Sequence, residues 1–316
     1  MEILPSVNVG SEVVLRDPLE QFLSGQLSEN TRRAYKTDLI KFFEFLTLDK
    51  ITIQDLRRIT FQDIVEFRNH LAGEGYKRTS INRKLSSLKA LFRMLVAAGQ
   101  IDQNPADSTL VRGYKIEDGL NGKAIATQAL KKIQQAISEE KNKLRQSRDM
   151  AIFQLLTFGG LRRSEVSKMR WIDIRVDGVF HILNLPDTKS GVDQDIKLQA
   201  VVMHYLNEYR NNLGDCGYQT EGHIFISLAR NRSNGKPLSD QSINLIVKKY
   251  ALRAGLPLNI SAHMFRHTCC TLAIEGGAKP QQVQAHLRHK DLKTTMRYYE
   301  NREKLTDNAS DYINLS

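Results

Sequence analysis

Two short stretches in the second half of the chain contain basic residues that could bind a phosphate group. Arg162 lies three positions before Glu165, so on a helix the carboxylate could hold the guanidinium group in a fixed orientation. Lys189 lies in the polar loop Asp187–Gly191, between two predicted strands. Ion pairs at this spacing are common on helix surfaces, and most lysines at hairpin tips are only solvated. Neither stretch predicts a function by itself.

A third stretch combines histidine with arginine. His263 and Arg266 are three residues apart and therefore share one face of a helix. His263 and His267 are four residues apart, which is also the spacing of a pair of metal ligands. However, Met264 occupies the position of the glutamate in the His-Glu-x-x-His motif, and the motif offers no further ligand. We therefore expect no bound metal.

A fourth stretch, residues 286–299, contains His289 and ends in the adjacent tyrosines Tyr298 and Tyr299. A tyrosine in this position could act as a nucleophile. The alternative is that it packs against the core, as a tyrosine at the end of a helix usually does. Taken one at a time, each of the four stretches fits a structural role better than a catalytic one.

The elements that must position these residues are mostly helices. Apolar residues recur at spacings of three and four, the period of an amphipathic helix, over Thr31–Leu46, Thr60–Gly73, Thr79–Ala98, Thr127–Glu139 and Ser147–Phe158. Short apolar runs predict strands over Trp171–Arg175, Val179–Leu185 and Asp195–Leu198, the first two joined by the turn Asp177–Gly178. The sequence thus predicts a mainly α fold with a small antiparallel β-sheet.

One predicted helix carries a run of basic residues without any acidic residue between them. The six members are Lys77, Arg78, Arg83, Lys84, Lys89 and Arg93. The alternative interpretation is a solvated helix face. Six cations with no acid to pair them, together with neighbouring serine and threonine hydroxyls, instead favour contact with the DNA backbone.

The overall composition agrees with a globular protein that binds a polyanion. The chain has 316 residues, of which 46 are Lys or Arg and 35 are Asp or Glu, for a net charge of +11. Hydrophobic residues make up 41%, enough for a packed core. The sequence has neither a signal peptide nor an apolar run long enough for a membrane helix, so we expect a cytoplasmic protein with no membrane partner.

Together and in this order, the stretches resemble the tyrosine recombinases, also called lambda-integrase-like recombinases. The ordered signature of that family is matched by Arg162, Lys189, His263 with Arg266, His289 and Tyr298. Gly160–Glu165, His263–Thr268 and Leu287–Leu292 are similar to its three local motifs. The first part of the chain, with Ser80–Leu85 and Asn104–Ala106, resembles the core-DNA-binding domain of the family.

The chain departs from the usual family pattern at several positions. Gly159 stands where the family usually has threonine, and Arg288 stands where it commonly has glycine. Lys197 is an alternative to Lys189 because the hairpin varies in length. Tyr298 is preferred over its neighbour because it lies nine residues beyond His289, which is the family spacing.

The resemblance implies a mechanism without metal or cofactor. The tyrosine would attack the DNA phosphodiester and form a 3′-phosphotyrosyl bond that conserves the bond energy. His263 would accept the phenol proton, since the ordinary pKa of tyrosine is about 10. Arg162, supported by Glu165, would bind the transition-state charge together with Arg266, and His289 would donate a further hydrogen bond. Lys189 would protonate the leaving 5′-oxygen.

The resemblance also implies the organisation of the enzyme. We expect a flexible arm (1–16), a helical core-DNA-binding domain (17–112), a linker (113–124) and a catalytic domain with a C-terminal tail (125–316), the two domains forming a clamp on DNA. The partner would be double-stranded DNA with inverted half-sites. A homotetramer would join two sites, and the tail, residues 300–316, would dock on a neighbouring protomer.

The biological role within the family stays open at this point. A mobile element is the expected setting, with either integration or the resolution of cointegrates or dimers as the task. Two alternatives share many of these features. A type IB topoisomerase would use much of the same residue set to relax DNA, and a non-catalytic DNA-binding regulator would account for the charge but not for the ordered signature.

Overall fold

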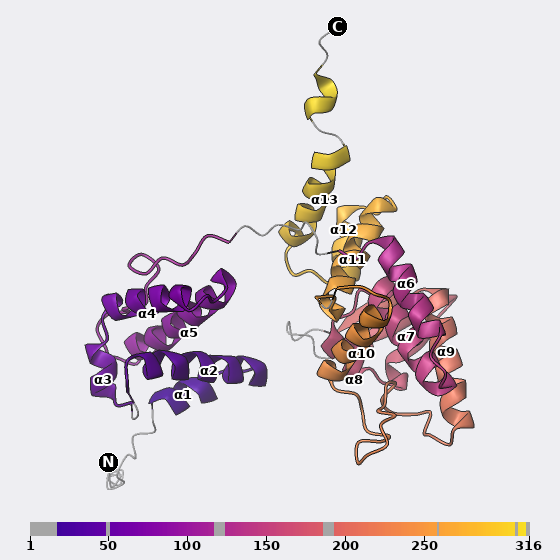
Figure 1. Cartoon of the computed structure of the whole chain (residues 1–316), viewed down its shortest axis with the longest axis horizontal. Helices are drawn as coiled ribbons and strands as arrows, with labels where there is room; N and C mark the ends of the chain where they lie inside the picture. Colours follow the sequence, from indigo (N-terminus) through magenta and orange to yellow (C-terminus); the bar gives the residue numbers. More distant parts are fainter. Residues whose placement is uncertain are drawn as a thin grey trace, which may run out of the picture. The chain divides into compact units, whose positions relative to one another are not determined.

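The computed structural model describes residues 18–48, 51–116, 124–185, 193–257, 259–306 and 309–313. The chain divides into two compact units, Met1–Asp118 and Gly119–Ser316 (Figure 1). The predicted arm, residues 1–16, lies outside the described residues, and the domain bounds given above stay a prediction. Within the described ranges, no helix is both long and apolar enough to cross a membrane.

The first unit is built from helices. Its described helices are α1 (Pro18–Ser24), α2 (Glu29–Phe45), α3 (Ile53–Arg58), α4 (Phe61–Gly73) and α5 (Arg78–Ala97). The bounds of α2, α4 and α5 agree with the sequence prediction to within two residues at each end. The short helix α3 was not predicted, because six residues are too few to show a helical period.

Capping interactions fix where two of these helices begin. The backbone amide of Asp55 donates to the Thr52 hydroxyl at the start of α3, and the Asp55 carboxylate accepts from the Thr52 amide. Thr60 and Asp63 form the same reciprocal pair at the start of α4. The apolar face of α5, which includes Leu88 and Phe92, is buried against the other helices.

The second unit combines helices with a small sheet. Its described helices are α6 (Thr127–Ser138), α7 (Lys143–Gly159), α8 (Arg163–Lys168), α9 (Ala200–Asp215), α10 (Asp240–Arg253), α11 (Ala262–Glu275), α12 (Pro280–Leu287) and α13 (Leu292–Thr306). The strands are β1 (Ile174–Asp177), β2 (Phe180–Leu185) and β3 (Gln194–Leu198), antiparallel in the order β1-β2-β3. The predicted fold class, mainly α with a small antiparallel sheet, is confirmed.

Two elements begin more than two residues away from their predicted starts. The first strand begins at Ile174 rather than Trp171, because residues 171–173 form a 3₁₀ turn in which the Asp173 carboxylate accepts from the Arg170 amide. Helix α7 begins four residues earlier than predicted, because the Asn142 side chain caps it. Both differences arise from hydrogen bonds of polar side chains, and the spacing of apolar residues contains no information about such bonds.

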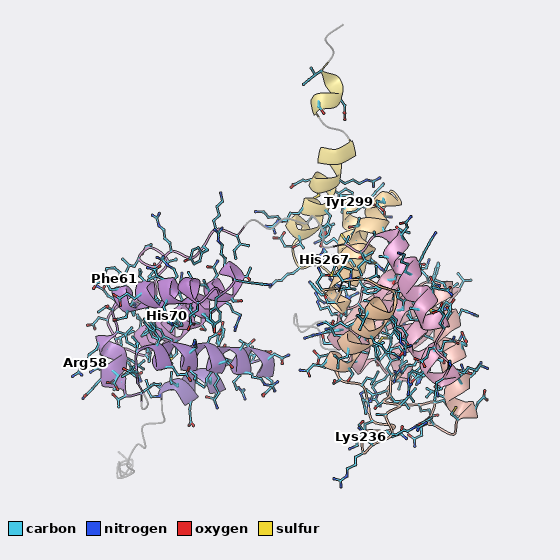
Figure 2. The ribbon with its side chains drawn as sticks, viewed as in Figure 1. Arg58, Phe61, His70, Lys236, His267 and Tyr299 are labelled. Atoms are coloured by element: carbon cyan, nitrogen blue, oxygen red, sulfur yellow. The ribbon has the colours of Figure 1, made fainter. Side chains whose placement is uncertain are left out.

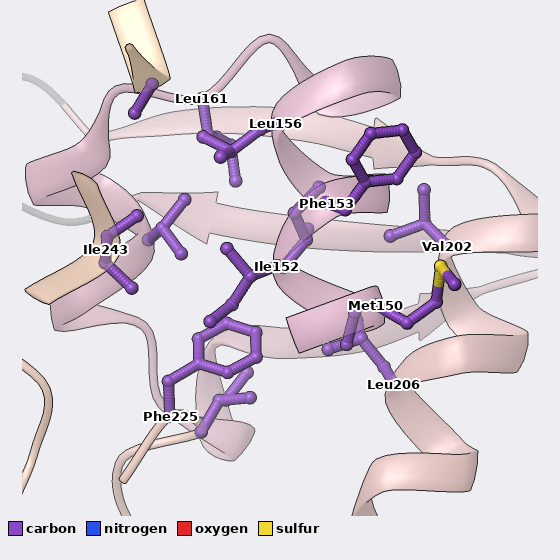
Figure 3. Close-up of a cluster of buried hydrophobic side chains, with 14 of the residues drawn as sticks. Met150, Ile152, Phe153, Leu156, Leu161, Val202, Leu206, Phe225 and Ile243 are labelled. Atoms are coloured by element: carbon purple, nitrogen blue, oxygen red, sulfur yellow. The ribbon is translucent and has the colours of Figure 1, made fainter. Parts of the chain in front are cut away.

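Helix α7 forms the centre of the second core. Its residues Ile152, Phe153 and Leu156 are buried, and they pack with Leu206 of α9 and Phe225 (Figure 3). Because α7 is enclosed by other elements along most of its length, its C-terminal end is held in a fixed place. The segment that follows this end carries Gly160 and Arg162.

Candidate active site

Gly160 ends α7 with a backbone conformation that favours glycine. Its φ is +55°, in the left-handed region, where a side chain is strained. The space beside it is also filled. A Cβ built on Gly160 would lie 3.1 Å from Sγ of Cys269 on α11, and closer still to a methyl group of Leu287 on α12. The glycine therefore lets three helix segments meet directly before Arg162.

Arg162 is held by the first turn of α8. Its backbone amide donates to Oε2 of Glu165 over 2.7 Å, and its guanidinium Nη1 donates to Oε1 of the same carboxylate over 2.6 Å. The Arg162 side chain keeps 45% of its surface exposed. The guanidinium group thus has a fixed direction and remains accessible to a ligand, as the sequence spacing predicts.

Arg266, by contrast, is buried in α11. Its Nη1 donates to the Gly160 carbonyl over 2.8 Å, and its Nη2 donates to the Leu287 carbonyl. These carbonyls end α7 and α12, whose negative dipole ends stabilise a cation. Burial, assisted by Arg162 and Arg288, lowers the pKa of Arg266 to about 10, so the group stays charged at neutral pH.

His289 follows α12 directly. Its Nδ1 is hydrogen-bonded to the hydroxyl of the fully buried Thr295 over 2.9 Å. Burial, together with the charges of Arg266 and Arg162, lowers the pKa of His289 to about 4, so the ring is neutral at physiological pH. When the Thr295 hydroxyl donates to Nδ1, the proton of the neutral ring lies on Nε2, which is the donor required for a phosphate.

Tyr298, on α13, faces a histidine that the sequence analysis considered only as a metal ligand. The Tyr298 hydroxyl is hydrogen-bonded to Nδ1 of His267, and the two rings stack at 5.8 Å. His263 packs edge-on against His267 at 4.8 Å and is itself exposed. His267 therefore contacts both the phenol of Tyr298 and the ring of His263. The sequence shows only that the two histidines share a helical face, which gives no indication of which one meets the tyrosine.

The neighbouring tyrosine has a different environment. Both tyrosines pack against the small apolar cluster around Cys270, but Tyr299 donates its hydroxyl proton to the Ala278 carbonyl. Burial and the nearby Cys270 raise the pKa of Tyr299. Figure 2 labels Tyr299 on α13 and His267 on the adjacent α11. The two tyrosine hydroxyls thus point in different directions, one toward a histidine and the other toward the backbone.

The predicted lysine cannot be placed. Lys189 falls in residues 186–192, which lie outside the described residues. The alternative, Lys197, is exposed on β3, where its ammonium group lies 4.4 Å from the centre of the Phe180 ring. The choice between the two lysines stays a prediction.

One of the proposed DNA contacts on α5 needs correction. Lys84 is only 5% exposed, and its ammonium group lies 3.0 Å from the carboxylate of the fully buried Asp38 on α2. Arg83 contacts the same carboxylate at 2.5 Å. The basic run therefore does have an acidic partner, supplied by another helix. Lys84 is a structural ion-pair residue, because reaching a DNA phosphate would take a buried cation away from the buried Asp38 carboxylate and leave Arg83 as its remaining partner.

The other basic residues of α5 are more accessible. Lys77, Arg78 and Arg93 are exposed, as is part of Arg83. Lys89 is half-buried and donates to the Ser108 hydroxyl over 2.7 Å. These five residues remain candidates for contact with a nucleic-acid backbone.

Sequence profiles of two protein domains match the chain. The profile described as the phage integrase family matches residues 123–304, which contain all the proposed catalytic residues, and that of the N-terminal SAM-like domain of phage integrases matches residues 19–99. The chain belongs to the phage integrase family of tyrosine recombinases. It is accordingly an enzyme of site-specific recombination, which breaks and rejoins DNA.

Relatives and solved structures agree with this assignment. A tyrosine recombinase of Agathobacter rectalis is 30% identical over 86% of each chain, and XerC of Pediococcus pentosaceus is 29% identical over 91% of this recombinase and 93% of its own chain. Among solved structures, a lambda integrase dimer bound to a COC′ core site has a TM-score of 0.67 and 22% identity over 96% of this chain and 80% of its own. XerH bound to a palindromic difH substrate has a TM-score of 0.68 and 19% identity, and the match covers 89% of this chain and 79% of the XerH chain. These two structures share the fold of the recombinase.

Proposed function

We propose that this recombinase cleaves DNA with Tyr298 and holds the cut end as a 3′-phosphotyrosyl ester. The supporting observation is the hydrogen bond between the Tyr298 hydroxyl and His267 on α11. The residue before His267 on this helix, Arg266, bonds to the carbonyls that precede Arg162 and His289. Helix α11 therefore carries Arg266 and the hydrogen-bond partner of the nucleophile, and it also contacts the two backbone segments that carry Arg162 and His289.

The chemical step exchanges one phosphate ester for another. The Tyr298 oxygen forms a bond to phosphorus, the bond from phosphorus to the 5′-oxygen breaks, and that oxygen receives a proton. Arg266 has five N–H donors, of which two bond to backbone carbonyls, so donors remain for the transition-state charge. Arg162 and Nε2 of His289 supply the other hydrogen bonds to the non-bridging oxygens.

The phenol proton passes first to His267. This proposal refines the sequence-based expectation for His263, because the Tyr298 hydroxyl is hydrogen-bonded to His267. His263, packed against His267 and exposed to solvent, is the next group outward and would exchange the proton with water. Lys189 remains the proposed general acid for the leaving oxygen.

The proposed substrate is double-stranded DNA with inverted half-sites. Among proteins of similar structure, XerH is bound to a palindromic difH substrate and the Tn1549 transposon integrase is bound to transposon right-end DNA. By analogy we propose a homotetramer on two sites, with the tail of residues 300–316 docked on a neighbour. The proposed setting is a mobile element, for integration or for resolution of cointegrates or dimers.

A suicide substrate that carries a nick near the cleavage point tests the nucleophile. We expect the purified recombinase to form a covalent protein–DNA adduct in EDTA, because the proposed mechanism uses only side chains of the protein. Tyr298→Phe should abolish the adduct and retain DNA binding, whereas Tyr299→Phe should retain the adduct. Adducts in both variants would contradict the tyrosine mechanism, and reversed outcomes would shift the nucleophile by one residue.

Recombination between two sites separates the rival functions. Joining of two inverted-half-site DNAs is expected from a recombinase. Relaxation of supercoiled plasmids without site preference would indicate a topoisomerase, and binding without any adduct would indicate a regulator.

The proton acceptor has its own test. His267→Ala should slow adduct formation by about 10²-fold or more, within the usual range for removal of a general base, while His263→Ala should have a smaller effect. A larger loss of adduct-formation rate in the His263 variant would indicate that His263 is the proton acceptor instead.

A further inference from the structure

Arg288 adopts a backbone conformation that is unusual for a residue with a side chain. It follows α12 with φ 55° and ψ 48°, in the left-handed region, and in the described part of the second unit it is the only residue other than glycine with a positive φ. Glycine would adopt this conformation without strain. The arginine is thus maintained at a position where the backbone alone favours glycine.

The charge of Arg288 is also buried. The residue is 8% exposed, and its side chain only 2%. Its Nη1 donates to the His286 carbonyl over 3.0 Å, and its Nη2 donates to Oε2 of Glu165 over 2.7 Å, while Nε is buried without a hydrogen-bond partner in the described structure. A strained backbone and a buried, incompletely bonded guanidinium group both destabilise the fold relative to glycine.

The contact with Glu165 connects Arg288 to the proposed active site. Oε2 of Glu165 accepts from both Arg288 Nη2 and the Arg162 amide, and Oε1 accepts from the Arg162 guanidinium. The carboxylate is therefore held on its inner side by Arg288 and on its outer side by Arg162. Its two partners come from separate elements, and Glu165 lies 123 residues before Arg288 in the chain.

We propose that Arg288 is a positioning residue, which fixes the Glu165 carboxylate so that Arg162 presents its guanidinium group to the scissile phosphate in one orientation. With glycine at this position, both oxygens of the Glu165 carboxylate would be bound by Arg162 alone, so the carboxylate could shift together with the half-exposed Arg162 side chain. The inference rests on the proposed active site. It adds Arg288 to the two arginines proposed to bind the phosphate, Arg162 and Arg266. Unlike them, Arg288 acts through Glu165 and does not contact the substrate.

The first test is Arg288→Gly, assayed by adduct formation on a suicide substrate under single-turnover conditions. We expect cleavage to slow by about 10- to 100-fold, by analogy with the loss of residues that orient the ligands of a catalytic metal. DNA affinity should stay near the wild-type value, and the thermal midpoint should equal or exceed that of the wild type. A merely structural role predicts the opposite pattern, with loss of stability and little change in cleavage.

Arg288→Asn provides a second variant, because asparagine also tolerates the left-handed conformation and lacks the cation. Arg288→Lys retains the charge without the fork and should recover only part of the rate. Wild-type cleavage rates in both the Gly and Asn variants would overturn the proposal.

A double-mutant cycle with Glu165→Gln separates action through Glu165 from a direct effect of charge on the phosphate. If Arg288 acts through Glu165, then Arg288→Gly should change the cleavage rate of the Glu165→Gln variant by less than about 2-fold. Equal losses in both backgrounds would mean that Arg288 acts on the phosphate directly, and would overturn the positioning role.

Thr47→Gly is the matched control. Among the described residues, Thr47 and Arg288 are the two non-glycine residues with positive φ, and Thr47, with φ 56°, lies in the first unit. It should preserve cleavage at the wild-type rate. If the wild-type enzyme itself forms no adduct, the proposed function fails. Normal wild-type cleavage with unaffected Arg288 variants would reject only the positioning role.

Discussion

Gly160→Ala should strongly destabilise the second unit, because two separate penalties meet at this position. The backbone has φ +55°, and an added methyl group would contact Cys269 and Leu287. The left-handed conformation costs an alanine about 1–2 kcal/mol. Overpacking of a filled core costs about 1–3 kcal/mol more. The free energy of unfolding should therefore fall by about 2–5 kcal/mol in total.

Gly178→Ala separates the two penalties. Gly178 has φ +57°, nearly the same as Gly160, but a Cβ there would meet nothing within 4 Å. This variant should therefore lose only the conformational part, about 1–2 kcal/mol. The difference between the two variants measures the packing of α7 against α11 and α12.

Thermal and urea unfolding of the two variants and the wild type provide the assay. For a unit of this size, each kcal/mol lowers Tm by about 2–4 °C. Leu287→Ala removes the closest methyl group, so it should relieve part of the Gly160→Ala penalty. The double variant should be more stable, by about 1–3 kcal/mol, than the sum of the single losses predicts. Equal destabilisation by Gly160→Ala and Gly178→Ala, or strict additivity with Leu287→Ala, would refute the close-packing argument.

Three further predictions concern charge. Lys84→Ala should destabilise the first unit by about 1–3 kcal/mol, because the buried Asp38 carboxylate loses one of its two cationic partners and keeps only Arg83. Arg93→Ala should instead flatten the dependence of log K on log salt by up to about 0.9 without affecting stability; salt titrations and urea unfolding distinguish these effects. Arg266→Lys should keep DNA binding but reduce adduct formation by about 10²-fold or more, because lysine lacks the fork; equal losses of binding and cleavage would contradict this role. Burial raises the pKa of Glu140, but hydrogen bonds and charges, mainly from Lys249, lower it to about 2 from 4.5. The lowered pKa therefore stabilises the fold above pH 4.5, and this stabilisation is lost as the pH falls toward 2. The free energy of unfolding should decrease by about 2 kcal/mol between neutral pH and pH 3. Unfolding of Glu140→Gln should show a correspondingly weaker acid dependence.

The sequence alone predicts those features that depend on neighbouring residues. Helices α2, α4 and α5 follow from the spacing of their apolar side chains, because a helix is a local structure with a fixed period. The family follows from the order of a few chemically distinctive residues along the chain. The distance of nine residues between His289 and Tyr298 indicates the candidate nucleophile without knowledge of the fold.

Features that depend on contacts between distant residues required the tertiary structure. The run around Lys84 has no acidic residue nearby in sequence, yet Asp38 lies 46 residues before it and pairs with it in the core. The different hydrogen-bond partners of the Tyr298 and Tyr299 hydroxyls, His267 on α11 and the Ala278 carbonyl, depend on how the helices pack.

Arg288 is the clearest example of a feature that depends on a contact between distant residues. In sequence it is an arginine where glycine is common, a difference that removes no catalytic group. Only the folded chain brings its guanidinium group to Glu165, 123 residues earlier, and reveals the strained backbone that carries it. Local periodicity determines which residues form helices, but the pairing of buried charges depends on how those helices pack, because an ion pair forms between groups that are close in space, whatever their separation in the chain.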